Sequence, residues 1–98
     1  MNTYIVLITL TEQGIRNIAQ STHRSEAFRQ AAEEAGTTVR QLYWTLGNYD
    51  GMLVVEAPDD DTVTALLVGL CAQGNVRTQS LRAFERVEFE AVLESATI

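Results

Sequence analysis

The chain has 98 residues, of which 46% are hydrophobic and 20% are charged, a composition typical of one folded domain over residues 1–98 and not of a disordered chain. Its formal net charge of −6, with seven scattered arginines and no lysine, argues against a nucleic-acid partner and excludes lysine-based Schiff-base chemistry. A single cysteine and a single histidine exclude an intramolecular disulfide and any two-histidine metal site within one chain.

The first residues of the chain bear on its cellular location. They lack the basic start and small-residue cleavage site of a secretory signal. No apolar run approaches the roughly 20 residues that are needed to cross a bilayer. We therefore expect a cytoplasmic protein with no membrane partner.

The first third of the chain predicts a strand followed by helices. Residues 3–10 are β-branched and apolar on both faces, as in a central strand. Thr11 can cap the helical segment that follows. Segment 12–35 contains a polar interruption near residues 20–23, so we predict a short helix, a break and a longer helix. Gly36 stands where a left-handed helix cap belongs.

The middle of the chain predicts a β-hairpin. Residues 39–46 and 51–57 alternate as strands do and flank the five turn-forming residues Gly47-Asn48-Tyr49-Asp50-Gly51. The tip of this hairpin presents a phenol and a carboxylate.

The last third predicts two helices and one strand. Pro58 and three aspartates after it mark a helix start, and Gly74 marks its end. Residues 75–84 alternate as a fourth strand, and residues 85–94 form a last helix. The order β-α-β-β-α-β-α predicts an α+β fold with a ferredoxin-like antiparallel sheet and a C-terminal helix.

Alternation along the strands separates the predicted sheet into two faces. The wholly apolar face, which suits the helices, holds Leu42, Trp44, Leu46, Leu53, Val55, Leu81 and Ala83. The mixed face holds Gln41, Tyr43, Thr45, Met52, Val54, Glu56, Val76, Thr78, Ser80 and Arg82. Partial burial against a second copy, leaving a polar-lined pocket, fits the mixed face best. We expect a homodimer, or a higher assembly of dimers, in which two sheets form a barrel.

Several blocks of the sequence, in order, resemble the GYD-domain family. They are Thr11-Glu12-Gln13-Gly14-Ile15-Arg16, Tyr43-Trp44-Thr45-Leu46-Gly47-Asn48-Tyr49-Asp50, Glu56-Ala57-Pro58-Asp59-Asp60 and Gly74-Asn75-Val76-Arg77-Thr78. The naming motif has the form Gly-x-Tyr-Asp here, with Asn48 inserted. The resemblance spans nearly the whole chain and implies a ferredoxin-like fold of the dimeric α/β-barrel group. It implies no catalytic residues, because the family's biochemical role is uncharacterised.

The hairpin tip has two interpretations. Asp50 can accept hydrogen bonds from nearby backbone amides or pair with Arg77, while Tyr49 packs over the hairpin. Alternatively, Tyr49 and Asp50 form an acid–base or hydrogen-bonding pair at the barrel mouth. His23, in the break between helices, fits a surface or capping role, with proton transfer or metal binding as the alternative.

The mixed face offers a second candidate site. Glu56 and Arg82 are either a salt bridge inside the dimer or, with Tyr43, a trio that orients a ligand whose apolar body contacts Met52. The candidate ligand-binding residues are therefore Tyr43, Met52, Glu56, Arg82, Tyr49 and Asp50.

The sequence leaves two classes of function open. We favour a dimeric protein of unknown role that binds a small apolar ligand or acts as an interaction or regulatory module. The alternative is a small cofactor-light enzyme of monooxygenase or isomerase type with its site in the barrel cleft, which rests on analogy of fold. No phosphate loop or metal motif is present, so we expect neither a cofactor nor a metal. The expected partners are a second copy and a small organic ligand.

Overall fold

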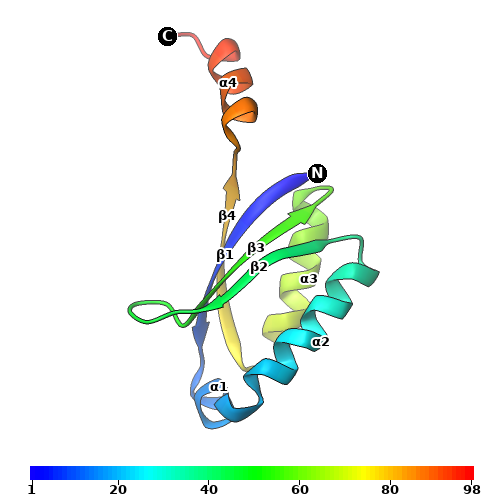
Figure 1. Cartoon of the computed structure of the whole chain (residues 1–98), viewed down its shortest axis with the longest axis vertical. Helices are drawn as coiled ribbons and strands as arrows, with labels where there is room; N and C mark the ends of the chain where they lie inside the picture. Colours follow the sequence, from blue (N-terminus) through cyan, green and yellow to red (C-terminus); the bar gives the residue numbers. More distant parts are fainter.

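A computed structural model describes residues 1–98 (Figure 1). The elements are β1 (Asn2–Leu10), α1 (Glu12–Arg16), the 3-10 helix η1 (Ile18–Gln20), α2 (Ser21–Glu34), β2 (Thr38–Trp44), β3 (Gly51–Ala57), α3 (Asp60–Ala72), β4 (Val76–Ala83) and α4 (Arg86–Ser95). This order is the predicted one, with the helical break falling at η1. No helix is long and apolar enough to span a bilayer.

The four strands form one antiparallel sheet in the order β2-β3-β1-β4. This is the ferredoxin-like arrangement that the sequence predicts. Helices α2 and α3 lie together on one side of the sheet (Figure 1). Between these layers lies the core, formed by Tyr4, Val6, Phe28, Ala32, Val39, Leu53, Val55, Ala57, Val63 and Leu67. The apolar stripes of α2 and α3 supply one half of it and the even-numbered residues of β1 supply part of the other.

Local sequence signals set the element boundaries. The Thr11 hydroxyl accepts a hydrogen bond from the Gly14 amide at 3.1 Å, and the Asp59 carboxylate caps α3 through the Thr62 amide at 2.8 Å. Gly14 is also required for close packing, because a Cβ there would lie 2.0 Å from the Asn75 carbonyl oxygen. The close approach of Gly14 to Asn75 joins the start of α1 to the turn before β4.

The opposite side of the sheet is covered by no element of the chain; we call it the open face. The register assigns to it Thr3, Ile5, Leu7, Thr9, Thr38, Gln41, Tyr43, Met52, Val54, Glu56, Arg77, Gln79, Leu81 and Ala83. The sequence predicted this face correctly for β3 and, in β2, for Gln41 and Tyr43.

The prediction for β4 was wrong by one residue. Tyr4, which is buried beneath the helices, pairs across the sheet with Arg82, so Leu81 and Ala83 point to the open face instead. The helix-covered side of β4 holds Val76, Thr78, Ser80 and Arg82. The odd-numbered and the even-numbered residues of β4 both include polar and apolar side chains, so the pattern does not show which set faces the helices. A shift of one residue exchanges the two faces.

The end of β2 also differs from the prediction. The strand ends at Trp44, because the Thr45 amide already bonds across the turn to the Asp50 carbonyl at 3.0 Å. Leu46 is therefore fully exposed in the hairpin loop, and Trp44 is 53% exposed at the sheet margin. Neither belongs to the core in which the sequence placed them.

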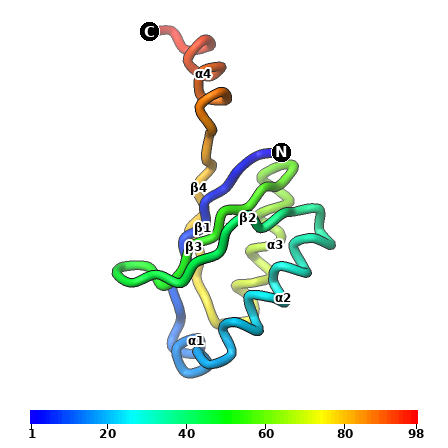
Figure 2. The backbone as a smooth tube through the Cα atoms, viewed as in Figure 1, coloured from blue at the N-terminus to red at the C-terminus, as the bar shows by residue number.

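Helix α4 projects beyond the end of the sheet, continuing the direction of β4 (Figure 2). Its N-terminus carries a reciprocal capping box between Glu85 and Glu88. The helix makes no extensive contact with any other element of its own chain.

Candidate functional site

The structure divides the six predicted site residues among three places. Tyr43 and Met52 are direct cross-strand partners on the open face, and Glu56 lies on the same face. Tyr49 and Asp50 occupy the hairpin loop. Arg82 lies on the opposite side of the sheet, so the predicted convergence of Tyr43, Glu56 and Arg82 is wrong.

Glu56 pairs with Arg40 instead of Arg82. The register of β2 shifts between Val39 and Gln41, and this irregularity carries the Arg40 side chain towards Glu56. The Glu56 carboxylate raises the pKa of the Arg40 guanidinium by hydrogen bonding and by charge. A bulge cannot be read from alternation alone, so no sequence signal points to this pair.

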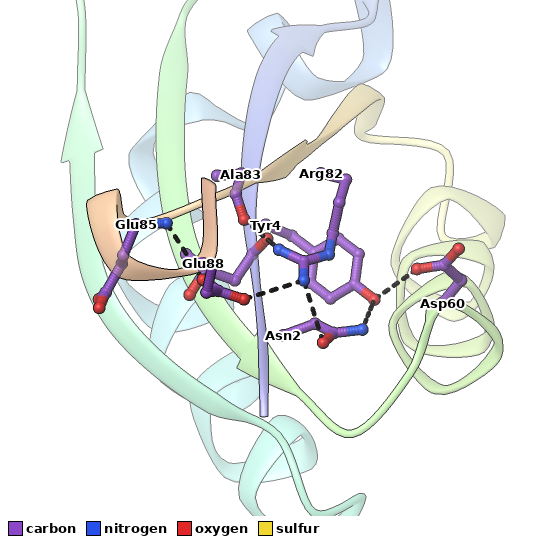
Figure 3. Close-up of polar contacts among 8 residues, drawn as sticks. Asn2, Tyr4, Asp60, Arg82, Ala83, Glu85 and Glu88 are labelled. Carbon is purple, nitrogen blue, oxygen red and sulfur yellow. Dashed lines mark hydrogen bonds and ion pairs between the residues drawn. The ribbon is translucent and has the colours of Figure 1, made fainter. Parts of the chain in front are cut away.

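Arg82 is the centre of a polar cluster that joins the sheet to α4, as Figure 3 shows. Its Nη2 donates to Glu88 Oε2 at 3.2 Å and to Asn2 Oδ1 at 3.1 Å. Its guanidinium also lies 4.4 Å from the centroid of the Phe84 ring and 5.8 Å from that of Tyr4. The Glu85 amide and Arg82 together lower the pKa of Glu88. We call these residues the Arg82 cluster.

Tyr4 extends the Arg82 cluster to α3. Its hydroxyl donates to Asp60 Oδ1 at 2.5 Å and accepts from Asn2 Nδ2 at 3.3 Å (Figure 3). Burial of the ring raises the pKa of Tyr4, and the hydrogen bond to Asp60 raises it further. The cluster is internally satisfied and ties together β1, β4, α3 and α4.

The hairpin residues are held by side-chain hydrogen bonds to β1 and β4. Asp50 Oδ2 accepts a hydrogen bond from the Leu10 amide at 2.8 Å, which satisfies a donor at the end of β1. The Tyr49 hydroxyl contacts Gln79 Oε1 at 3.2 Å. Asp50 and Arg77 form no ion pair. His23 is exposed on α2. The structural interpretation of Asp50 is thus the one that the geometry favours.

The centre of the open face is apolar. Ile5 lies between its cross-strand partners Val54 and Leu81, and Leu7 lies beside Met52. Leu81 is 42% exposed. Threonine, glutamine and charged side chains surround this centre. An apolar centre with a polar rim is the usual anatomy of a protein–protein interface.

A separate cavity of about 90 Å³ lies on the helix side, between η1, the start of α2 and the root of the hairpin. Its walls are mainly apolar and include Phe28, Leu42 and Leu53, with Arg24 and Asp50 among the polar residues. The cavity is smaller than the roughly 150 Å³ that holds benzene in a protein core. No group of three or more histidine, cysteine, aspartate or glutamate side chains is arranged to hold a metal ion.

Comparison with known proteins identifies the family. The model of the GYD domain matches residues 4–93. A curated relative from Thermus thermophilus, the "Glutamine synthetase and cystathionine beta-lyase binding protein", is 36% identical over 95 residues, which cover 96% of this chain and 100% of the relative.

Solved structures agree with the fold. The crystal structure of TTHA0845 from Thermus thermophilus is similar with a TM-score of 0.56 and 26% identity, covering 87% of this chain and 95% of that one. The crystal structure of FFRP-DM1 is similar in fold, with a TM-score of 0.60 and 17% identity over 86% of this chain and 100% of that one. The chain belongs to the GYD-domain family.

Proposed function

We propose that this member of the GYD-domain family is a protein-binding module that works as a homodimer, with the open face as its self-association surface. The observation that carries the proposal is the uncovered apolar centre of that face, formed by Ile5, Leu7, Met52, Val54 and Leu81. Contiguous apolar patches of this kind mark interaction sites on small proteins. A second copy supplies a matching surface because a two-fold interface uses the same patch on both subunits.

The proposed partners beyond the dimer are metabolic enzymes. The curated relative is named for binding glutamine synthetase and cystathionine beta-lyase, and it aligns with this chain over its whole length. The hairpin projects from the sheet (Figure 1). Trp44 and Leu46, which are 53% and 102% exposed and are not among the residues that the register assigns to the open face, supply a surface for such a partner. Exposed aromatic anchors are typical of binding hot spots.

A charge on the open face tests self-association. Val54→Asp places an unpaired carboxylate in the proposed interface, which should dissociate the dimer at micromolar concentration. Val68→Asp is the matched control, because Val68 is 62% exposed on α3, on the other side of the molecule. Sedimentation velocity should show a monomer for Val54→Asp alone. Dimers that are equally stable in both variants would contradict the role of the open face.

Binding to enzymes is tested separately. The immobilised protein is presented with purified glutamine synthetase and with cystathionine beta-lyase from Thermus thermophilus, and serum albumin serves as the control. We expect saturable binding of at least one enzyme and weaker binding of that enzyme after Trp44→Ser. Absence of binding to both enzymes would contradict this choice of partner.

The cavity supports a second candidate function, the binding of a small apolar molecule. It includes Tyr43 and Asp50 but not Met52, Glu56 or Arg82, so such a ligand would lie on the helix side of the sheet. Trp44, the only tryptophan, lines the cavity and reports on its occupancy. Xenon, an apolar probe smaller than benzene, should change Trp44 fluorescence saturably as its pressure is raised; a response that remains linear in xenon pressure would refute a defined site.

The enzyme alternative has less support from the geometry. The Asp50 carboxylate is engaged by the Leu10 amide, and the Tyr49 hydroxyl is engaged by Gln79. These contacts occupy the groups that an acid–base pair at the hairpin tip would need. Loss of a turnover in Tyr49→Phe, with the fold intact, would restore that alternative.

A further inference from the structure

Helix α4 lies outside the body of its own chain. It extends past the end of the sheet in both Figure 1 and Figure 2. The radius of gyration is 14.8 Å, compared with about 12.6 Å for a compact domain of this length. A helix of ten residues is marginal in water without packing. The shape of the chain therefore leaves α4 without extensive packing against another helix or strand of its own chain.

The helix carries an apolar stripe that no other helix or strand of the chain covers. Phe89, Val92 and Leu93 recur at helical spacing and are 48%, 43% and 46% exposed. The Phe89 ring meets Phe84 edge-on at 6.3 Å between centroids, which prolongs the stripe towards β4. Val87 lies on the other side of the helix and is 77% exposed.

Contacts at the N-terminal end of α4 fix the orientation of the helix relative to the sheet. Arg82 binds Glu88 in the first turn of the helix, and the capping box closes the helix N-terminus (Figure 3). The Arg82 guanidinium also covers the Phe84 ring. These contacts hold the helix as a stiff projection in place of a frayed terminus, so its stripe is presented at a defined angle to the sheet.

The chain exposes more surface than a compact monomer of its mass, and the excess is about as large as the area that one partner buries in an interface. The chain exposes 6619 Å², whereas a compact monomer of 10.9 kDa exposes about 5,600 Å². The excess of about 1,000 Å² exceeds the roughly 800 Å² that each partner buries in a standard interface. One further copy of the chain can therefore account for the excess.

The acidic charge of α4 indicates which part of the second copy this helix would contact. The helix and its cap carry Glu85, Glu88, Glu90 and Glu94 against Arg86 alone, so two α4 helices side by side would repel. The far end of the sheet, where β1 ends and β4 begins, presents the exposed Arg77, which has no ion-pair partner in the chain. Two exposed apolar residues lie at the same end, Ile15 at 58% and Ile18 at 53%.

We infer that α4 of one copy packs its Phe89–Leu93 stripe on the far end of a second copy, beside Ile15 and Arg77. The inference rests on the proposed open-face dimer. In such a dimer, a two-fold axis that lies between the two sheets and runs perpendicular to the strands reverses the strand direction. It therefore brings the end of β4 in one copy to the start of β4 in the other. The arrangement is reciprocal, so each dimer contains two such contacts and each α4 covers apolar surface on its partner.

One pair of matched variants tests whether α4 is in the interface. Leu93→Glu puts a charge in the stripe, whereas Val87→Glu puts the same charge on the other side of the same helix. Sedimentation equilibrium should show the dimer dissociation constant raised at least about 30-fold by Leu93→Glu and unchanged by Val87→Glu, the loss expected at a buried contact. Both variants should keep the circular dichroism spectrum of the sheet.

The outcomes separate this inference from the proposed function. A dimeric wild type whose dissociation constant is unchanged by Leu93→Glu would overturn the docking of α4 and leave the open-face dimer standing. A monomeric wild type would instead overturn the proposed function itself.

Cross-linking tests where α4 docks. In a Cys71→Ser background, the double variant Ile15→Cys, Val92→Cys should form a covalent dimer with a short bismaleimide, and neither single variant should. The two sites belong to α1 and α4, which lie at opposite ends of one chain, so the link must join two copies (Figure 1). Efficient cross-linking of Val92→Cys alone would place the two α4 helices together and overturn the proposed location.

Discussion

Replacing Tyr4 by phenylalanine tests the hydrogen bond that joins the sheet to α3. The change removes only the hydroxyl, which donates to Asp60 at 2.5 Å, and keeps the buried ring. A hydrogen bond to an ionised partner contributes about 1.5–3 kcal/mol, and water can replace the phenol at the exposed Asp60 carboxylate. We therefore expect the free energy of unfolding at pH 7 to fall by about 1.5 kcal/mol, measured by urea denaturation at one fixed protein concentration.

The same variant has a pH signature. Burial, and then the Asp60 hydrogen bond, raise the pKa of Tyr4 above its ordinary value, so the folded state holds this proton more tightly than the unfolded state does. The resulting stability is complete below about pH 10 and is lost as the pH rises through the folded pKa. The difference between wild type and Tyr4→Phe should therefore shrink in alkali.

Tyr43→Phe in the Val54→Asp background, compared with Val54→Asp alone, is the control, because the open face is not covered by a second copy there, Tyr43 is 51% exposed and its hydroxyl has no hydrogen-bond partner within the chain. It should change the free energy of unfolding by less than about 0.5 kcal/mol. Equal stability of Tyr4→Phe and wild type at pH 7 would refute the contribution of the Tyr4 hydrogen bond.

Three further substitutions test the local geometry, each by thermal unfolding. Gly47→Val should destabilise by about 1–3 kcal/mol because φ is +107° there, and an unchanged melting temperature would refute the strained turn. Asp50→Ala should cost about 1–3 kcal/mol by leaving the Leu10 amide without its acceptor; a neutral effect would show that water replaces the carboxylate. Gly14→Ala should destabilise by at least about 1 kcal/mol, because the new Cβ would lie 2.0 Å from the Asn75 carbonyl oxygen, and a stable variant would contradict that close approach.

Element order and most boundaries could be predicted because the signals are local. Thr11, Asp59 and Gly36 mark helix ends by side-chain chemistry or by a positive φ, and the structure has each of them in that role. The glycine at position 47 likewise has the positive φ that a tight turn requires. Such features depend on a few neighbouring residues and little on the rest of the fold.

The candidate site was harder to predict because it depends on contacts between distant strands. Alternation in β4 does not reveal that Arg82 faces inward, where Glu88 and the rings of Tyr4 and Phe84 offset the cost of burying its charge. The register shift beside Arg40 similarly provides Glu56 with a partner that its position in the sequence does not suggest. In both cases the missing information was which residues face each other across the sheet.

Oxidation of Met52 by hydrogen peroxide measures whether the open face is buried between two copies, because this residue lies on that face and Met1, 66% exposed, serves as an internal reference. If the open face is buried between two copies, Met52 in the wild type should oxidise much more slowly than Met1 at high protein concentration. The Val54→Asp variant should remove that protection. Oxidation of Met52 at the same rate in both proteins and at every concentration would show that the open face is not buried between two copies.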